Sequence, residues 1–291
     1  MIKYEWRTEL SASEATELAG LLERAARYDA EPEYSTIDIA DIAASMADPH
    51  SGDRHLLIWM LPHATALSEP DAPERIAGVL RLAASGAAAA EAVVVIDPDL
   101  RSIGIMTLLL ETLGLDTGAT TVTAWARGNH PAAGRLSNRF LIPRTRRVWK
   151  LIRSTEPSPE SAAAPVLEPI TAASAGELSW YTKPSGVVED YALREAGRVV
   201  AVCRFRDDAA HSDEFGPCLT IERTLAAPSA SSADLRRLLD GAVVHAREQG
   251  RTGLIVFVDS DDTALVHAAR LAGFQHDRTD VRFQLGATGG R

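Results

Sequence analysis

The residues best suited to chemistry lie in a short loop, residues 101–106, with the sequence RSIGIM. An apolar, β-branched segment at 92–96 precedes the loop and predicts a buried strand, and the composition of 103–113 predicts a helix with Ser102 as its N-cap. A loop that leads into a helix N-terminus presents unpaired amide groups at the positive end of the helix dipole. We therefore expect a site for a phosphate or pyrophosphate, where Gly104 allows close backbone approach and Arg101 adds a positive charge. The alternative is an ordinary strand-to-helix turn with an incidental glycine.

The composition of the chain limits the classes of protein to which it can belong. Its 291 residues allow about two domains. With 30 Lys and Arg against 40 acidic residues the net charge is −10, which argues against a nucleic acid partner. No apolar run approaches the ~20 residues of a membrane span, and the N-terminus lacks the apolar stretch of a signal peptide. Cys203 and Cys218 are expected to be buried, reduced thiols of a cytoplasmic protein, with no disulfide framework and no metal site.

The periodicity of the first half predicts alternating strands and helices around the loop. A capping-box pattern, Ser11 to Glu14, opens the first helix. The expected strands are 3–8, 54–61, 75–82, 92–96, 120–126 and 145–153, and the expected helices are 13–28, 37–46, 103–113 and 132–139.

The second half repeats the later part of this order after a Pro- and Ser-containing linker at 154–165. The expected strands are 187–195, 198–205, 218–225, 253–258 and 279–285, and the expected helices are 235–249, capped by Ser232 or Asp234, and 261–272.

The strand, loop and helix around residues 101–106 resemble the acetyl-coenzyme-A loop of the GNAT acetyltransferases. The family pattern, Arg/Gln-x-x-Gly-x-Gly/Ala, follows a strand that often ends in Asp-Pro, as Asp97-Pro98 does here. Only Met106 departs from the pattern, since the family prefers Gly or Ala at that position.

The whole chain resembles tandem GNAT proteins of the mycothiol synthase type. This resemblance rests on KYEWR at 3–7, WARGNHPAA at 125–133, RVWKL at 147–151, VFVDSDDTA at 256–264 and LAGF at 271–274. It implies an α/β (α+β) fold of two tandem GNAT-like domains, each with a mixed central sheet flanked by helices and the second reduced. The expected domains are 1–153 with the acetyl-CoA loop, then the linker 154–165, the reduced domain 166–285 and a flexible tail 286–291.

The resemblance also implies which residues hold acetyl-CoA and where. In that family the second domain does the chemistry, but here its loop, PSASSA at 228–233, lacks the basic residue and the glycine, so we expect the cofactor in the first domain. The expected cofactor-binding residues are Val93, Val94, Val95, Arg101, Ser102, Ile103, Gly104, Ile105, Met106 and Asn129.

The expected chemistry is acetyl transfer to an amine. An amide group near Val94 or Val95 can face the thioester oxygen, and Glu91 lies on the strand face of Val93, where it can act as base directly or through water. The alternative for Glu91 is a solvated carboxylate, and the alternative for Asn129 is a helix cap. The tyrosine that many GNAT enzymes use as general acid is replaced by Ser137 in the first domain and by Ala269 in the second.

We therefore expect a cytoplasmic acyltransferase that moves an acetyl group from acetyl-CoA to a small-molecule amine, without metal, membrane or nucleic acid. The oligomeric state cannot be read from the residues. Two alternatives stay open: a CoA-binding sensor or regulatory protein of the same fold that has lost catalysis, and a structural pairing of two domains that binds no ligand.

Overall fold

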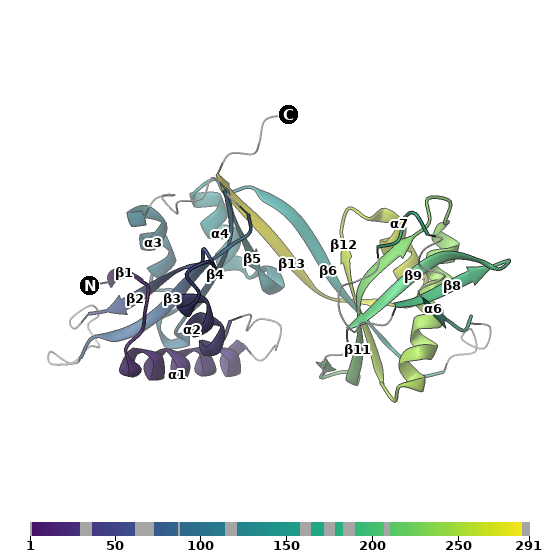
Figure 1. Cartoon of the computed structure of the whole chain (residues 1–291), viewed down its shortest axis with the longest axis horizontal. Helices are drawn as coiled ribbons and strands as arrows, with labels where there is room; N and C mark the ends of the chain where they lie inside the picture. The colour runs from purple at the N-terminus through teal and green to yellow at the C-terminus, as the bar shows by residue number, and fades with distance from the viewer. Residues whose placement is uncertain are drawn as a thin grey trace. The chain divides into compact units, whose positions relative to one another are not determined.

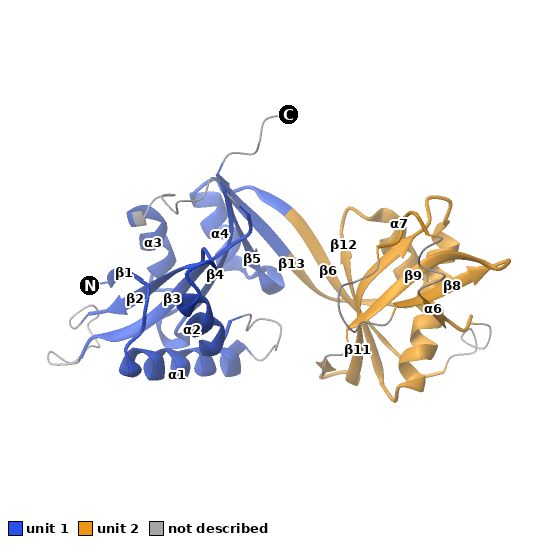
Figure 2. Ribbon diagram, viewed as in Figure 1, with its two compact units in different colours: residues 1–145, 281–291 blue, residues 146–280 orange. Residues whose placement is uncertain are grey.

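The computed structural model describes residues 2–29, 37–61, 73–86, 88–113, 121–157, 164–171, 178–182, 190–206 and 210–286 (Figure 1). Contacts divide the chain into two compact units (Figure 2). Unit 1 holds Met1–Thr145 and Val281–Arg291, and unit 2 holds Arg146–Asp280. Half of the expected linker (158–163), all of the expected tail except Gly286, and the start of the expected strand at 187–195 lie outside the described residues. None of the described helices is long and apolar enough to cross a membrane.

Unit 1 follows the predicted order of elements closely. The capping box that opens α1 is confirmed, since Glu14 Oε2 accepts from the Ser11 amide at 2.8 Å and Ser11 Oγ accepts from the Glu14 amide at 3.3 Å. The elements are β1 (Ile2–Arg7), α1 (Ala12–Asp29), α2 (Ile39–Ala47), β2 (Arg54–Met60), β3 (Arg75–Ala84), β4 (Ala89–Ile96), the 3-10 turn η2 (Pro98–Leu100), α3 (Ile105–Leu113), β5 (Thr121–Ala126), the 3-10 turn η3 (Arg127–Asn129) and α4 (Pro131–Arg139).

The sheet of unit 1 runs β1-β2-β3-β4-β5 and is antiparallel except between β4 and β5. Alternate residues of a strand point to opposite faces, so the apolar strand β2 can cover two cores. Leu57 and Trp59 pack with the helix residues of α1 and α2, whereas Leu56 and Ile58 pack with those of α3. The two groups of helices therefore lie on opposite faces of the sheet, as Figure 1 shows.

Unit 2 contains the remaining strands, with two helices packed on its core. Its elements are β6 (Arg144–Ser154), β7 (Glu168–Pro169), β8 (Asp190–Glu195), β9 (Arg198–Arg206), β10 (His211–Ser212), β11 (Gly216–Ala226), α6 (Ser232–Glu248), β12 (Gly253–Asp259), α7 (Thr263–Leu271) and β13 (Gln275–Gly286). The strand order is β7-β8-β9-β11-β12-β6, with β10 paired to β11.

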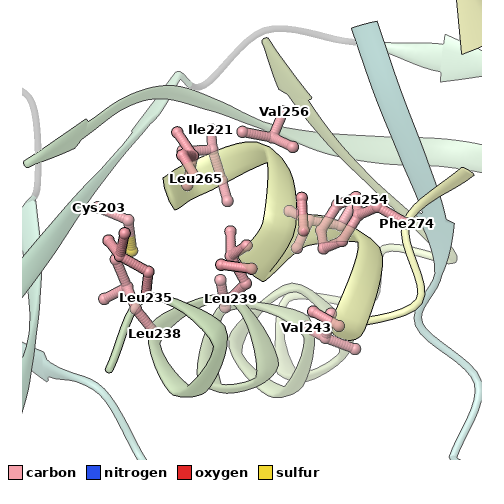
Figure 3. Packing of buried hydrophobic residues seen from close by; sticks show 14 of the residues in the cluster. Cys203, Ile221, Leu235, Leu238, Leu239, Val243, Leu254, Val256, Leu265 and Phe274 are labelled. Carbon is pink, nitrogen blue, oxygen red and sulfur yellow. The ribbon is translucent and has the colours of Figure 1, made fainter. Parts of the chain in front are cut away.

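The core of unit 2 lies between the sheet and α6 with α7 (Figure 3). Leu238 and Leu239 of α6 are fully buried there, beside Leu254 of β12 and Leu265 of α7. Cys203 belongs to this core, and both cysteines are buried, as predicted. Burial is the main reason that the pKa of the Cys203 thiol is raised, and a protonated buried thiol is unreactive.

The closing strands of the two units do not follow chain order. The expected first domain ended with the strand now seen as β6, but residues 148–154 of that strand pair with β12 of unit 2. The last part of β13, Val281–Gly286, pairs antiparallel with β5 of unit 1. Each unit is therefore completed by a strand from the other half of the sequence.

Candidate functional site

The two parallel strands at the centre of unit 1 pair only at their start and then diverge. Residues 89–92 of β4 pair with residues 121–124 of β5, and no later pair joins the two strands. Beyond that point β4 continues along β3 to Ile96, while β5 continues along β13 to Ala126. Within the described residues, the β5 side of β4 therefore has no neighbouring strand from Val93 to Ile96.

The hydrogen bonds to β3 show which backbone groups of β4 face this opening. The Asp97 amide donates to the Ala77 carbonyl and the Ser85 amide donates to the Ala89 carbonyl, both at 2.9 Å, so the odd-numbered residues of β4 point their backbone groups at β3. Backbone groups alternate along a strand, so the amide and carbonyl of Val94 point into the opening. Of Val94 and Val95, the two residues expected to supply an amide to the thioester oxygen, only Val94 therefore directs its amide into the opening.

The loop after β4 enters α3 with backbone angles that favour glycine. Gly104 has φ +93°, is exposed, and a Cβ there would meet nothing within 4 Å. Its carbonyl accepts from the Leu108 amide at 3.0 Å, so Gly104 takes the place before the first residue of α3, Ile105. The predicted cap, Ser102, is wrong: it has φ +68° and lies three residues before the helix starts.

The N-terminus of α3 is open and carries no negative charge. Its first turn contains no acidic residue. Among the described residues nothing accepts a hydrogen bond from the amides of Gly104, Ile105 and Met106. The hydroxyl of Tyr4 on β1 donates to the Ile105 carbonyl at 3.2 Å and so holds the start of α3 against the sheet. Burial raises the pKa of this phenol to about 12. Nothing in the local sequence signals this contact, which joins residues 101 positions apart.

The Arg101 side chain is directed at α1. Its Nη1 and Nη2 donate to the carboxylate of Asp29 at 2.5 and 3.1 Å, and its Nε donates to the Ile96 carbonyl at 3.1 Å. The guanidinium carbon also lies 5.2 Å from the centre of the Tyr28 ring. The positive charge expected at the loop is therefore already paired with a carboxylate, and Arg101 braces the loop against the end of α1.

Glu91 lies on β4 just before the strands diverge. It pairs with Ala83 on β3 and Thr123 on β5 and is half-buried. Val93 and Val95, on the same strand face, pack with the core under α1 and α2. Val94 is three residues away along the strand, a distance of about 10 Å at ~3.3 Å per residue. A proton can pass over that distance only through water.

The turn after β5 contributes Asn129. Asn129 is exposed, with φ +48°, and lies in η3 at the same sheet edge as residues 101–106, because β4 and β5 are parallel. The alternative role of Asn129 as a helix cap is wrong: His130 caps α4, since its Nδ1 accepts from the Ala132 amide at 3.2 Å. The Asn129 side chain is therefore not used as the cap.

Unit 2 contains the same strand divergence. Residues 218–221 of β11 pair in parallel with residues 253–256 of β12, after which β11 follows β9 and β12 follows β6. A register shift between Ile221 and Arg223 makes Glu222 a bulge at the point where the strands part. Sequence reasoning did not predict this bulge.

The helix after this second divergence begins differently from α3. Ser231, and neither Ser232 nor Asp234, is the N-cap of α6. The Asp234 carboxylate accepts from the amide and the hydroxyl of Ser231, each at 2.7 Å. A negative charge thus already occupies the N-terminus of α6.

Comparison with known proteins gives a consistent set of relatives. No family model matches the chain. The mycothiol acetyltransferase of Saccharomonospora viridis is 26% identical over 99% of this chain and 100% of its own length, and that of Paenarthrobacter aurescens is 26% identical over 89% and 88%.

Two solved structures have a similar fold over nearly the whole chain. One is a tandem GNAT protein from the clavulanic acid biosynthesis pathway, with a TM-score of 0.62 and 14% identity over 100% of both chains. The other is a GCN5-related N-acetyltransferase from Sphaerobacter thermophilus, with a TM-score of 0.58 and 13% identity over 97% of this chain and 95% of its own. The predicted fold class, a tandem GNAT fold with mixed sheets flanked by helices, is confirmed.

Proposed function

We propose that this chain, which has the tandem GNAT fold and resembles mycothiol acetyltransferases over nearly its whole length, acetylates the amine of a small molecule with acetyl-CoA. The names of the relatives support an active acetyltransferase, and nothing in the comparisons favours the inactive sensor. They also support an acceptor of the mycothiol type. We assign acetyl-CoA to unit 1.

The observation that carries this assignment is the contrast between the two helix starts. A pyrophosphate binds where several amide groups converge and no negative charge competes. At the start of α3 the amides of Gly104, Ile105 and Met106 have no acceptor in the part of the chain that the structure describes, and the first turn of α3 holds no acidic residue. The start of α6 holds the Asp234 carboxylate on Ser231, which would repel a phosphate at close range.

The opening beside β4 supplies the other requirements of acetyl transfer. The Val94 amide points into this opening and can donate to the thioester oxygen, where negative charge develops when the amine attacks. The Val94 carbonyl can accept from an amide of the pantetheine arm. Asn129 at the same edge supplies a further side-chain amide.

The reaction needs one proton removed and one supplied. The neutral amine nitrogen attacks the thioester carbon, the new C–N bond forms, and the C–S bond breaks with the thiolate as leaving group. The proton lost by the amine goes to Glu91 through water, because about 10 Å of strand separates Glu91 from Val94. Ser137 is buried in α4 and is a poor acid, so solvent water protonates the thiolate.

Two measurements test the proposal. Isothermal titration of acetyl-CoA should give a stoichiometry near one per chain. Incubation with acetyl-CoA and a panel of amines, among them cysteinyl glucosaminyl-inositol, should release free CoA thiol only when an acceptor is present. Binding without thiol release from any amine would favour the sensor. An affinity that rises in Asp234→Lys and is unchanged in Gly104→Asp would move the cofactor to unit 2.

A further inference from the structure

A pocket in unit 2 lies outside the strand divergence and outside the site proposed above. It has a volume of about 370 Å³ and lies where α7 covers β6 and the first part of β13. This volume is at the lower end of the range for small-molecule sites. The residues that line it are Trp149, Leu151, Val266, Arg270, Phe274, His276 and Thr279.

The floor of the pocket is apolar and its rim is polar. Leu151 and Phe274 are buried, with 4% and 6% of their surface exposed, and they belong to the core of unit 2, where Figure 3 shows Phe274 beside Leu254. Arg270 and His276 are exposed at the rim. A ligand that fills this pocket therefore needs an apolar body and one polar end.

Aromatic contacts give the pocket one flat wall. The indole of Trp149 is half-buried and meets the His276 ring edge to face, with ring centres 5.8 Å apart. His276 is held in place by Thr279, whose Oγ1 lies 2.9 Å from His276 Nε2. A planar ring is the shape that packs best against such a wall.

The charge of the pocket selects for an anion. The Arg270 guanidinium carbon lies 5.7 Å from the centre of the Trp149 ring, a cation–π contact that uses none of the N–H donors of the arginine. No described residue gives Arg270 a carboxylate partner, and none of the lining residues is acidic. The nearby Asp277 is paired with Lys150 at 3.1 Å. In a chain of net charge −10, this is a cationic and aromatic recess.

We propose that this pocket, defined by Trp149, Phe274, Arg270 and Thr279, binds a small carboxylic acid that carries one planar ring. The ring packs on Trp149 and Phe274, and the carboxylate accepts paired hydrogen bonds from Arg270, the geometry in which arginine binds carboxylates best. When His276 Nε2 donates to Thr279 Oγ1, the Thr279 hydroxyl can donate a further hydrogen bond to the carboxylate. The proposal concerns unit 2 alone and does not depend on where acetyl-CoA binds.

The test uses the full chain without acetyl-CoA and phenylacetate as the probe, with phenylacetamide as the neutral isostere. We expect saturable binding of phenylacetate, and a dissociation constant at least about tenfold higher for phenylacetamide, since a charged hydrogen-bonding partner is lost. Arg270→Met retains the apolar stem and should raise the dissociation constant for phenylacetate by at least about tenfold. Arg198→Met removes the same charge from the exposed start of β9 and should leave it unchanged.

Three results would overturn the proposal. They are equal binding of the acid and the amide, equal weakening in Arg270→Met and Arg198→Met, and no saturable binding of phenylacetate up to about 10 mM, which is weaker than a site of this kind should be. Circular dichroism controls for folding. Should Arg270→Met fail to fold, Trp149→Leu replaces it, with the same weakening of phenylacetate binding expected from loss of the flat wall.

Discussion

Replacement of Gly104 by aspartate places a carboxylate where we expect the pyrophosphate. A Cβ at Gly104 would meet no protein atom within 4 Å, so the new side chain projects into open space at the start of α3. Two unit charges about 4 Å apart repel by about 1 kcal/mol in a water-like medium and by about 4 kcal/mol at the effective dielectric of a protein surface. Each 1.4 kcal/mol is a factor of ten, and a pyrophosphate carries more than one charge. The dissociation constant for acetyl-CoA should therefore rise at least about tenfold.

The same substitution also strains the backbone, and a matched control separates the two effects. A left-handed residue other than glycine costs about 1–2 kcal/mol. Gly197, in the β8–β9 hairpin of unit 2, has φ +80° against +93° for Gly104 and likewise has nothing within 4 Å of a built Cβ. Gly197→Asp should thus lose similar stability while it keeps acetyl-CoA affinity. Gly104→Ala, which adds the strain without the charge, should bind better than Gly104→Asp.

Isothermal titration of acetyl-CoA, with the melting temperature of each variant beside it, decides the matter. Affinity that is the same in wild type and folded Gly104→Asp would refute the assignment of the pyrophosphate to this loop. An equal loss in Gly104→Asp and Gly197→Asp would show that the effect is one of stability and not of charge at the site.

Three further perturbations follow from contacts around the site. Asp29→Asn should tighten acetyl-CoA binding, because it removes the carboxylate that now neutralises Arg101; weaker binding in a titration would instead show that the ion pair is needed to hold the loop. Tyr4→Phe should lower the free energy of unfolding, measured by urea denaturation, by about 1 kcal/mol, because the hydrogen bond to the Ile105 carbonyl is lost. An unchanged free energy of unfolding would show that this hydrogen bond does not stabilise unit 1. Burial is the largest cause of the lowered pKa of His55. The contribution of neutral His55 to the stability of unit 1 should therefore be complete above the unfolded pKa of about 6.5. That contribution should be lost as the pH falls through the lower pKa of the folded state. Urea unfolding at several pH values measures this dependence, and the free energy of unfolding should change less with pH in His55→Gln than in the wild type. The same change with pH in both proteins would count against a role of His55.

The sequence predicts the local elements well, because hydrophobic periodicity and capping patterns are local signals. The strand before the loop and the capping box of α1 both follow from neighbouring residues. The helix boundaries are less readable. Ser102 and Ser232 were plausible caps by type, but the backbone puts Gly104 and Ser231 in those places.

Contacts between distant residues carry no such signal. The ion pair of Arg101 with Asp29 joins residues 72 positions apart, so the local sequence does not show that the charge of this arginine is already paired. The bulge at Glu222 depends on the register with β9, which no single strand encodes. The apolar pattern of a strand likewise indicates that the strand is buried in a sheet, but it does not identify the neighbouring strands. The pairing of β6 with β12 and of β13 with β5 therefore could not be predicted from the sequence.

This exchange makes the site in unit 1 dependent on the end of the chain. All six residues of β5 pair with residues 281–286 of β13, on the side of β5 that faces away from β4. This pairing includes residues 125 and 126, which no longer pair with β4. Val281 and Phe283 are buried there, with 1% and 8% of their surface exposed. Loss of those two side chains alone costs about 1.5–3 kcal/mol each. It also removes the strand that holds the last part of β5 away from β4, so that β5 is free to close onto β4.

Truncation after Asp280 should therefore abolish acetyl-CoA binding, although it removes no residue of the proposed cofactor site. Truncation after Gly286 spares every pair with β5 and should leave the dissociation constant unchanged, which makes it the matched control. Titration of both proteins, with circular dichroism to confirm that the sheet persists, measures the difference. Full affinity in the shorter protein would mean that β4 and β5 diverge without β13, and the strand that holds the site open would have to be sought elsewhere.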